Sequence, residues 1–345
     1  MGLVVDRIAT SLGTLWGISP EIHRPSPVVP IVDNYDRLLY PADAPARSDR
    51  YARYLGDGLM LRTHTTAAIP PLLSSITGPD GASMERLLLC PGLVYRRDCV
   101  DRTHVGEPHQ LDVWRITNGP RLGLEDLVGM VRTVLEAIFS GARWRAAATS
   151  HPYTDEGLEI EAEFGGRWVE ILECGLASQA LLSRCGLDPG RWSGLALGLG
   201  LDRAVMLAKR IDDIRLLRAE DPRIASQMRD LASNRPVSRQ QASTRDLSVA
   251  APAGMDDEEA GDRIRAMLGV RADLVEEVRI VARHAARDVP PQAAARLGLR
   301  GNQENLLVRV VVRAPDRPVS RAEAAEIQRL AYQALHSGEA PGYMA

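Results

Sequence analysis

Apolar and polar positions in the middle of the chain follow two periods, one typical of helices and one typical of strands. In residues 125–139, apolar side chains recur every three or four positions, which predicts a helix with one buried face. Residues 158–164 read Leu-Glu-Ile-Glu-Ala-Glu-Phe, an alternation that predicts a half-buried strand with its carboxylates turned outward. Residues 168–172 predict its antiparallel partner, because Gly165-Gly166 between them is a strong hairpin signal.

The two ends of the chain show different patterns. About the first 45 residues carry scattered prolines and few periodic runs, so we expect an irregular lead-in with room for one short helix. Residues 233–245 are polar, rich in Ser, Gln and Arg, and include a proline, which is typical of an interdomain linker. A length of 345 residues favours two domains. We therefore expect one domain over 1–232, the linker, and a second domain over 246–345.

The second domain is expected to run strand, helix, strand, strand, helix, which is the order of a ferredoxin-like α/β sandwich. These elements are predicted at 246–250, 256–268, 274–282, 306–312 and 321–335. A closing strand is hardly visible in 338–345. The acidic run 256–259 is interpreted as a charged first helical turn, which the helix dipole favours.

Composition excludes some classes of function and leaves others open. The formal net charge is −3 and Lys209 is the only lysine, so charge alone gives no argument for nucleic-acid binding. No stretch approaches the roughly 20 apolar residues of a membrane span, and the N-terminus shows no secretory pattern, so we expect a cytoplasmic protein without a membrane partner. The four cysteines form no C-x-x-C pair, which suggests neither a zinc site nor a disulfide framework.

The first segment with candidate chemistry is 92–110, which reads G-L-V-Y-R-R-D-C-V-D-R-T-H-V-G-E-P-H-Q. An arginine at the end of a strand, such as Arg96, can donate two hydrogen bonds to a phosphate, and an imidazolium in the loop, such as His104, can meet the outer phosphates. Adenylyl transfer depends on such preplaced positive charge. In isolation a loop of this kind is usually a solvated turn.

The second segment is 194–203, which reads G-L-A-L-G-L-G-L-D-R. Its three glycines allow a flat ligand to approach the backbone closely. Arg203 stands where the strand becomes a helix, where it can stack on an adenine and contact phosphate. Tight packing between strand and helix is the alternative reading. The spacing is neither that of a P-loop nor that of a dinucleotide-binding fold.

In this order, the two segments resemble motifs 2 and 3 of class II aminoacyl-tRNA synthetases, and within that class the phenylalanine–tRNA ligase family. Motif 2 of that family typically reads V-Y-R-R-D-x-x-D-x-T-H-x-x-x-F-H-Q, and this chain differs mainly by Pro108 in place of the phenylalanine. Further matches lie at 34–39, 41–47, 61–66, 211–215 and 220–223, so the resemblance covers roughly residues 30–230.

The resemblance implies an α+β fold, with the antiparallel sheet of a class II synthetase flanked by helices and followed by the smaller ferredoxin-like domain. That second domain is similar to the anticodon-binding domain of the single-chain form of the family. The implied activity is ATP-dependent activation of phenylalanine or a similar amino acid as the aminoacyl-adenylate, with transfer to tRNA. ATP and Mg²⁺ are the implied cofactors, an amino acid and tRNA the implied partners, and the oligomeric state stays open between monomer and homodimer.

The resemblance also assigns roles to individual residues. For ATP, Arg96 would clamp the α-phosphate, Asp98 would lie near the adenine amino group, His104 near the outer phosphates, and Arg203 at the γ-phosphate and adenine. The expected catalytic residues are Arg96, His104 and Arg203. The residues expected to hold the substrate's ammonium and carboxylate groups are His64, Thr66, Gln110 and Asp112, the last shorter than the usual glutamate. For Mg²⁺, Asp155 or Glu170 is the expected carboxylate.

The expected side-chain pocket departs from the family pattern. The family has F-P-F-T where this chain has His151-Pro-Tyr153-Thr, and G-C-G where this chain begins with Glu173. Ala196 remains at the pocket floor. A buried polar group without a partner costs about 1–3 kcal/mol, so either the new polar atoms reach water or the substrate carries a polar partner.

Three interpretations follow from the sequence. The chain is a phenylalanine–tRNA ligase, or a paralogue that activates another amino acid, proteinogenic or not, for tRNA or a small acceptor, or a non-catalytic RNA-binding relative. Retention of the arginines and histidine that would clamp phosphate argues against the third, since an inactive site need not keep them. The changes at 151 and 153 separate the first two.

Overall fold

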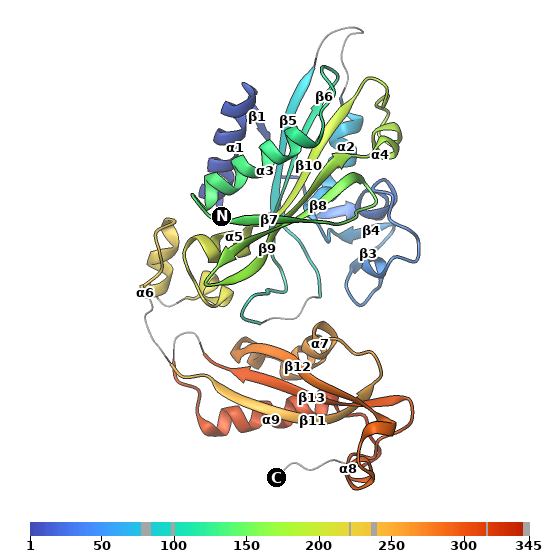
Figure 1. The fold of residues 1–345 in the computed structure, drawn as a ribbon, viewed down its shortest axis with the longest axis vertical. Coiled ribbons are helices and arrows are strands. Elements are labelled where there is room, and N and C mark those ends of the chain that lie inside the picture. Colours follow the sequence, from blue (N-terminus) through green and yellow to red (C-terminus); the bar gives the residue numbers. More distant parts are fainter. Residues whose placement is uncertain (77–83, 98–100, 221, 236–239, 315–316, 341–345) are drawn as a thin grey trace. The chain divides into compact units, whose positions relative to one another are not determined.

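The computed structural model describes residues 1–76, 84–97, 101–220, 222–235, 240–314 and 317–340 (Figure 1). The chain divides into two compact units, and each of them takes up separate stretches of sequence. The first unit comprises 1–97, 107–210 and 230–232, and the second comprises 98–106, 211–229 and 233–345. The domain boundaries expected at residues 232 and 245 stay a prediction.

A seven-stranded sheet forms the centre of the first unit. Its strands lie in the order β1-β5-β6-β10-β9-β8-β7, and all neighbours are antiparallel except β1 and β5, which are parallel. Their bounds are β1 Pro20–Ile22, β5 Glu85–Leu93, β6 His109–Thr117, β7 Trp144–Ala148, β8 Thr154–Phe164, β9 Arg167–Ala177 and β10 Ser193–Gly200. This antiparallel-rich sheet with flanking helices confirms the predicted fold class.

The first unit also contains short strands and helices, and a further short helix belongs to the second unit. The strands of a small sheet in the order β2-β4-β3 lie in the chain between β1 and β5 of the large one. The bounds of these elements are β2 Val28–Pro30, β3 Arg53–Gly56, β4 Leu59–Leu61, α2 Ile69–Ser74, α4 Gln179–Arg184, α5 Leu201–Ala208 and, in the second unit, α6 Pro222–Ala225.

The hairpin of β8 and β9 shows how local sequence sets the register. Phe164 pairs with Arg167, and the two glycines between them have φ of 57° and 76°. Two successive positive φ angles are what a two-residue hairpin turn needs, and glycine adopts them without steric cost. The predicted hairpin is confirmed, although both strands extend beyond 158–164 and 168–172, because pairing continues across a bulge near Gly157.

The N-terminal segment forms a longer helix than expected. Helix α1 spans Gly2–Trp16 and ends at Gly17, whose φ is 67°. The expectation of no more than a short helix is wrong, and the physical reason is tertiary. No side chain caps the start of α1, but its buried face packs against α3, Leu124–Ile138, the helix predicted at 125–139.

The second unit contains a three-stranded antiparallel sheet in the order β11-β13-β12. Its elements are β11 Ser243–Pro252, α7 Asp257–Leu268, β12 Val275–Ala285, α8 Pro291–Leu297, β13 Gln303–Val312 and α9 Arg321–Leu335. Apolar side chains of α7 and α9 share one core with β11 and β13. The predicted order strand, helix, strand, strand, helix is confirmed, whereas α8 was not anticipated and β11 begins inside the expected linker. In the segment 338–345, where a closing strand was hardly visible in the sequence, residues 341–345 lie outside the described residues.

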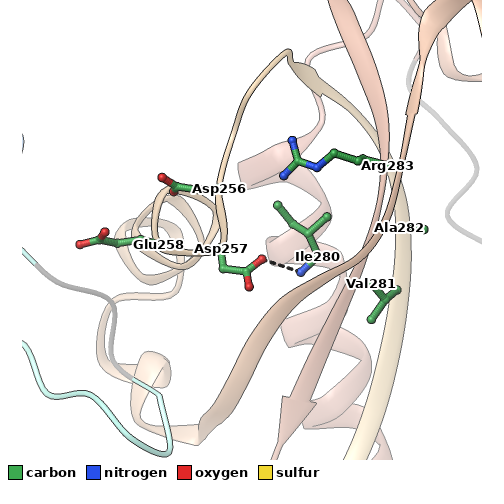
Figure 2. Close-up of a pocket in the computed structure, with 7 residues that line it drawn as sticks. All are labelled: Asp256, Asp257, Glu258, Ile280, Val281, Ala282 and Arg283. Atoms are coloured by element: carbon green, nitrogen blue, oxygen red, sulfur yellow. Dashed lines mark hydrogen bonds between the residues drawn. The ribbon is translucent and has the colours of Figure 1, made fainter. Parts of the chain in front are cut away.

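The acidic run at the start of α7 has a structural role, as predicted. Asp256 caps the helix by accepting a hydrogen bond from the backbone N–H of Glu259 at 2.7 Å. Asp257 accepts the backbone N–H of Ile280 at 2.8 Å and so ties the helix to β12 across a shallow hollow (Figure 2).

Two expectations about membranes and thiols can be compared with the structure. No helix in the described part of the chain combines the length and the apolar character that a membrane crossing requires. Cys90, Cys174 and Cys185 are buried free thiols, and Cys99 lies outside the described residues.

Lys209, the only lysine of the chain, binds residues 230–232, which belong to the first unit although the residues before and after them belong to the second. Its side chain is 1% exposed, and its ammonium donates to the carbonyl oxygen of Asp230 at 3.0 Å, to Asp230 Oδ1 at 3.2 Å and to the carbonyl oxygen of Ala232 at 2.8 Å. A buried ammonium must satisfy its three protons, and these acceptors do so. The chain that follows 229 is therefore held at residues 230–232.

We expect Lys209→Met to lower the free energy of unfolding by about 2–4 kcal/mol, because it leaves two carbonyl oxygens without their charged donor. Urea unfolding followed by circular dichroism measures this. Arg132→Met, on an exposed position of α3, is the matched control and should change stability by no more than about 0.5 kcal/mol. Equal effects of the two substitutions would contradict the role given to Lys209.

Candidate active site

The floor of the candidate site is one strand without large side chains. Strand β10 lies between β6 and β9. On the site side of β10 stand Ala196, Gly198 and Gly200, and the leucines between them point to the other face. A Cβ atom added at Gly198 would meet no atom within 4 Å, and one at Gly200 would meet only Arg203 Cβ at 3.9 Å. The space above these glycines is therefore open to a flat ligand.

The face assignment follows from contacts on either side of the sheet. Ala196 belongs to the same buried cluster as Trp114, its cross-strand partner on β6. The neighbouring cross-strand pair is Leu195 and Arg115, and the Arg115 guanidinium lies 4.5 Å from the ring centre of Trp16 on α1. Helix α1 thus lies on the leucine face, and the site lies on the opposite one.

The sheet register places a polar wall on each side of this floor. On β6, Asp112 is opposite Gly198 and Gln110 is opposite Gly200. On β9, Glu173 is also opposite Gly198. Two strand spacings of roughly 4.8 Å separate the backbones of Asp112 and Glu173. A ligand on the glycines would therefore lie between two carboxylates.

Asp112 is a buried carboxylate held by three donors. Thr65 Oγ1 donates to it at 2.7 Å, Thr66 Oγ1 at 3.0 Å and Trp114 Nε1 at 3.1 Å. Burial raises the pKa of Asp112, and these donors act against that shift. Thr66 and Asp112 were predicted site residues. Thr65 and Trp114 were not, although the strand alternation puts Trp114 on the same face as Asp112.

His64 provides a buried imidazole next to this carboxylate network. Burial, aided by the nearby charge of Arg96, lowers the pKa of His64 to about 3, so the ring is neutral near pH 7. It stacks on Tyr40 with ring centres 5.7 Å apart. Neither ring nitrogen has a hydrogen-bond partner among the described residues. Gln110 Oε1 accepts the backbone N–H of Thr65 at 3.3 Å, which joins the predicted Gln110 to the same region.

Aromatic rings line the end of the floor at Ala196. Tyr153 lies 6.3 Å from Trp114 and 6.2 Å from Tyr40, measured between ring centres. Burial raises the pKa of Tyr153 well above its ordinary value, so its hydroxyl keeps its proton. His151 stacks on Tyr153 at 5.6 Å, with an interplanar angle of 19°. The predicted residues 151, 153 and 196 therefore lie together.

At the other end of β10, Arg203 lies in the first turn of α5, three residues beyond Gly200. Its guanidinium donates to the carbonyl oxygen of Glu170 at 3.2 Å and lies 3.5 Å from Glu170 Oε2. The preceding residue, Asp202, is buried and accepts the backbone N–H of His109. Arg96 follows the end of β5 and is partly buried. Its charge acts on the pKa of both His64 and Tyr40, so its electrostatic influence reaches the predicted amino-acid pocket.

Two of the predicted ATP contacts are not placed at this site. Asp98 lies outside the described residues. His104 belongs to the second unit, where its Nδ1 is 3.0 Å from the carboxylate of Asp101 and 3.0 Å from Thr103 Oγ1. Both assignments stay predictions.

The two carboxylates proposed for Mg²⁺ cannot act on one ion together. Asp155 is opposite Leu176 and Glu170 is opposite Glu161, so the two are separated by about 20 Å along the hairpin. Among the described residues no group of three His, Cys, Asp or Glu side chains is arranged to hold a metal. Glu170 is the one of the two that lies beside Arg203.

Arg62 is a buried residue of this region that the sequence reasoning missed. Its Nε donates to the carbonyl oxygen of Leu93 at 2.8 Å. A Cβ at Gly92 would overlap its guanidinium. A side chain at Gly92, the glycine that opens the first chemical segment, would therefore force the Arg62 guanidinium to shift.

Comparisons with known proteins point to one family. The model of the tRNA synthetases class II core domain (F) matches residues 22–228. The phenylalanine–tRNA ligase alpha subunit of Prochlorococcus marinus (strain MIT 9313) is 40% identical over 194 residues, which are 56% of this chain and 56% of that one. The subunit of the same name from Nostoc punctiforme is 37% identical with the same coverage. The chain spans about half the length of the curated relatives it matches.

Among solved structures, PylSc of Desulfitobacterium hafniense, a pyrrolysyl tRNA synthetase, is similar with a TM-score of 0.46 and 16% identity, over 61% of this chain and 70% of that one. The family model covers more than half of the present chain, including both arginine-bearing segments and the glycine strand between the two polar walls. The chain therefore belongs to the class II tRNA synthetase family described by that core domain.

Proposed function

We propose that this chain activates an amino acid with ATP and passes the acyl group to tRNA. The observation that carries the proposal is the open strand β10, which has a guanidinium at one end and a buried carboxylate beside its middle. An adenylate needs both features, since its phosphate requires positive charge and the ammonium of its amino acid requires an acceptor.

In the proposed reaction, the carboxylate of the amino acid attacks the α-phosphorus of ATP and pyrophosphate leaves. Arg96 holds the α-phosphate, and Arg203 holds the γ-phosphate and stacks on the adenine. A hydroxyl of the terminal ribose of tRNA then attacks the acyl carbon of the adenylate, the ester forms and AMP leaves. Because no side chain has to transfer a proton in the first step, positioning and charge stabilisation supply most of the acceleration.

Mg²⁺ would neutralise the phosphate charges when ATP is bound. Such ions are usually held by one or two carboxylates together with the phosphates themselves. Glu170 suits this role, because it projects beside Arg203. Its contact with Arg203 keeps the carboxylate at the phosphate end of the floor.

Beside the middle of the strand, Asp112 would accept the substrate's ammonium group, while Thr65, Thr66 and Trp114 fix the orientation of its carboxylate. His64, being neutral, can accept a hydrogen bond from that ammonium without repelling it. Gln110 would meet the substrate's carboxylate. His104 and Asp98 would contact ATP, and the second unit would contact tRNA; these assignments rest on the family resemblance.

We expect Arg203→Ala to reduce ATP–pyrophosphate exchange at least about a hundredfold, as loss of a charge-stabilising donor commonly does. Exchange assays on the purified chain measure this, with circular dichroism to verify folding. Arg132→Ala, on the opposite face of the sheet, should leave exchange unchanged. Exchange that survives in a folded Arg203→Ala protein would disprove the assigned role.

Asp112→Asn should raise the KM for the amino acid by about ten- to a hundredfold and leave the KM for ATP nearly unchanged, because a charged acceptor of the ammonium is lost. Asn fills the same volume and can still accept from the threonines. The control is Asp6→Asn, an exposed position on α1. A rise in the KM for ATP alone would show that Asp112 acts on the nucleotide and would contradict its assignment to the ammonium of the amino acid.

The acceptor separates this proposal from its main alternative, a paralogue that loads a small molecule. With the labelled amino acid that exchange identifies and total tRNA, we expect acid-precipitable label that ribonuclease removes. Label found only in small molecules would favour the alternative.

A further inference from the structure

His151 and Glu173 form a polar pair beside Tyr153, one of the aromatic rings at the Ala196 end of the floor. His151 Nε2 lies 3.0 Å from Glu173 Oε2, and the two side chains are 22% and 36% exposed. His151 precedes β8 and Glu173 lies on β9. These are the positions at which the family pattern has phenylalanine and glycine. Two departures that are separate in sequence are therefore in contact in the structure.

The stacking of His151 on Tyr153 closes the slot that the family resemblance implies. The two rings are nearly parallel, with centres 5.6 Å apart. A third ring inserted between them would need about 7 Å, twice the contact distance of roughly 3.5 Å between carbon atoms. A phenyl side chain therefore cannot be sandwiched between residues 151 and 153 as they stand, and the substrate's side chain must occupy the space beside them.

That space is bordered by hydrogen-bonding groups. Glu173 is opposite Gly198, above which the site is open. A carboxylate only accepts hydrogen bonds, and its two oxygens offer about four acceptor positions, more than one imidazole can fill. On the far side of Gly198, Asp112 already orders three donors. Glu173 is thus the acceptor that faces the side-chain end of the substrate.

His151 fixes the direction and the charge of this acceptor. The Glu173 carboxylate raises the pKa of His151, so the imidazole carries its proton more readily with Nε2 next to Oε2. The pair holds Glu173 in one orientation and offsets its charge. A neutral donor group is therefore accepted without a counter-ion of its own.

We propose that the site selects amino acids whose side chain carries a hydrogen-bond donor, such as a hydroxyl, an amide N–H or an amine. Glu173, positioned by His151, is the residue that selects them. This inference rests on the proposed activation of an amino acid. Phenylalanine would supply no donor for the acceptor positions of Glu173 that His151 does not fill, and a site that is built to bind a polar group disfavours an analogue that lacks it.

ATP–pyrophosphate exchange with the full chain tests the inference. Phenylalanine, leucine and methionine are compared with tyrosine, 3-hydroxyphenylalanine, 4-aminophenylalanine, glutamine and lysine. We expect the best donor-bearing amino acid to exceed phenylalanine in kcat/KM by about tenfold to a hundredfold. Equal or faster exchange with phenylalanine overturns the inference and leaves the proposed function intact. No exchange with any amino acid overturns both.

Variants then assign the selectivity to Glu173. Glu173→Met keeps the length of the side chain and removes its acceptor, so the preference over phenylalanine should fall at least about tenfold. The double variant H151F with E173G should turn the preference toward phenylalanine. The control is Glu21→Met at the edge strand β1, which removes a carboxylate that lies 3.5 Å from His23 and also accepts from Arg86 Nε at 2.8 Å. That variant should keep the preference of the wild type.

A preference that persists in Glu173→Met overturns the role of Glu173. If the variants do not fold, binding to the unaltered chain decides. Thermal shifts with the sulfamoyl-adenosine analogues of tyrosine and phenylalanine should then be larger for tyrosine. A larger shift with the phenylalanine analogue overturns the inference.

Discussion

The alternation of side chains along β10 is the constraint on which the rest of the site depends. Leucines on one face bury the strand beneath the helices, and glycines and an alanine on the other leave the strand bare. Because β6 and β9 flank it in register, any polar residue opposite a glycine faces the same open space. One face of this strand thus packs into the hydrophobic core, and the other face is the surface on which a ligand can lie. A side chain larger than methyl at Gly198 would fill that space without disturbing the core.

The sequence predicted the helices, strands and turns whose conformation is determined by residues close to them in the chain. The two glycines between β8 and β9, the apolar stripe of α3 and the element order of the second unit each carry their own signal, and the structure has them. Helix α1 carries no capping signal and is formed by packing against α3, so its length could not be predicted from local sequence. The donor Thr65 illustrates the same limit for the site. It lies 47 residues from Asp112, in the 3₁₀ turn Thr65–Ala68, so its bond depends on tertiary packing. Trp114, by contrast, lies on the same strand as Asp112, and the alternation of that strand was a local signal for it.

The His151–Glu173 contact resolves an ambiguity that the sequence left open. From the sequence, each polar residue in an apolar pocket required either water or a polar substrate. In the structure the two meet across neighbouring segments, with Nε2 of His151 3.0 Å from Oε2 of Glu173, so the charge of one lies next to the other. Removing one partner alone would leave the other with an uncompensated charge near a partly buried surface.

The layout of the site lets the amino-acid end differ while the nucleotide end stays the same. Arg203 and Gly200 lie at one end of the strand, and Ala196 lies four residues away near Tyr153, a separation of about 13 Å. Changes at 151 and 173 therefore leave the proposed phosphate contacts in place. In the proposed reaction Asp112, midway between, meets the ammonium that every amino acid carries, so it need not change with the side chain. Such a division makes a new substrate compatible with an unchanged activation chemistry, since selectivity and charge stabilisation use different residues.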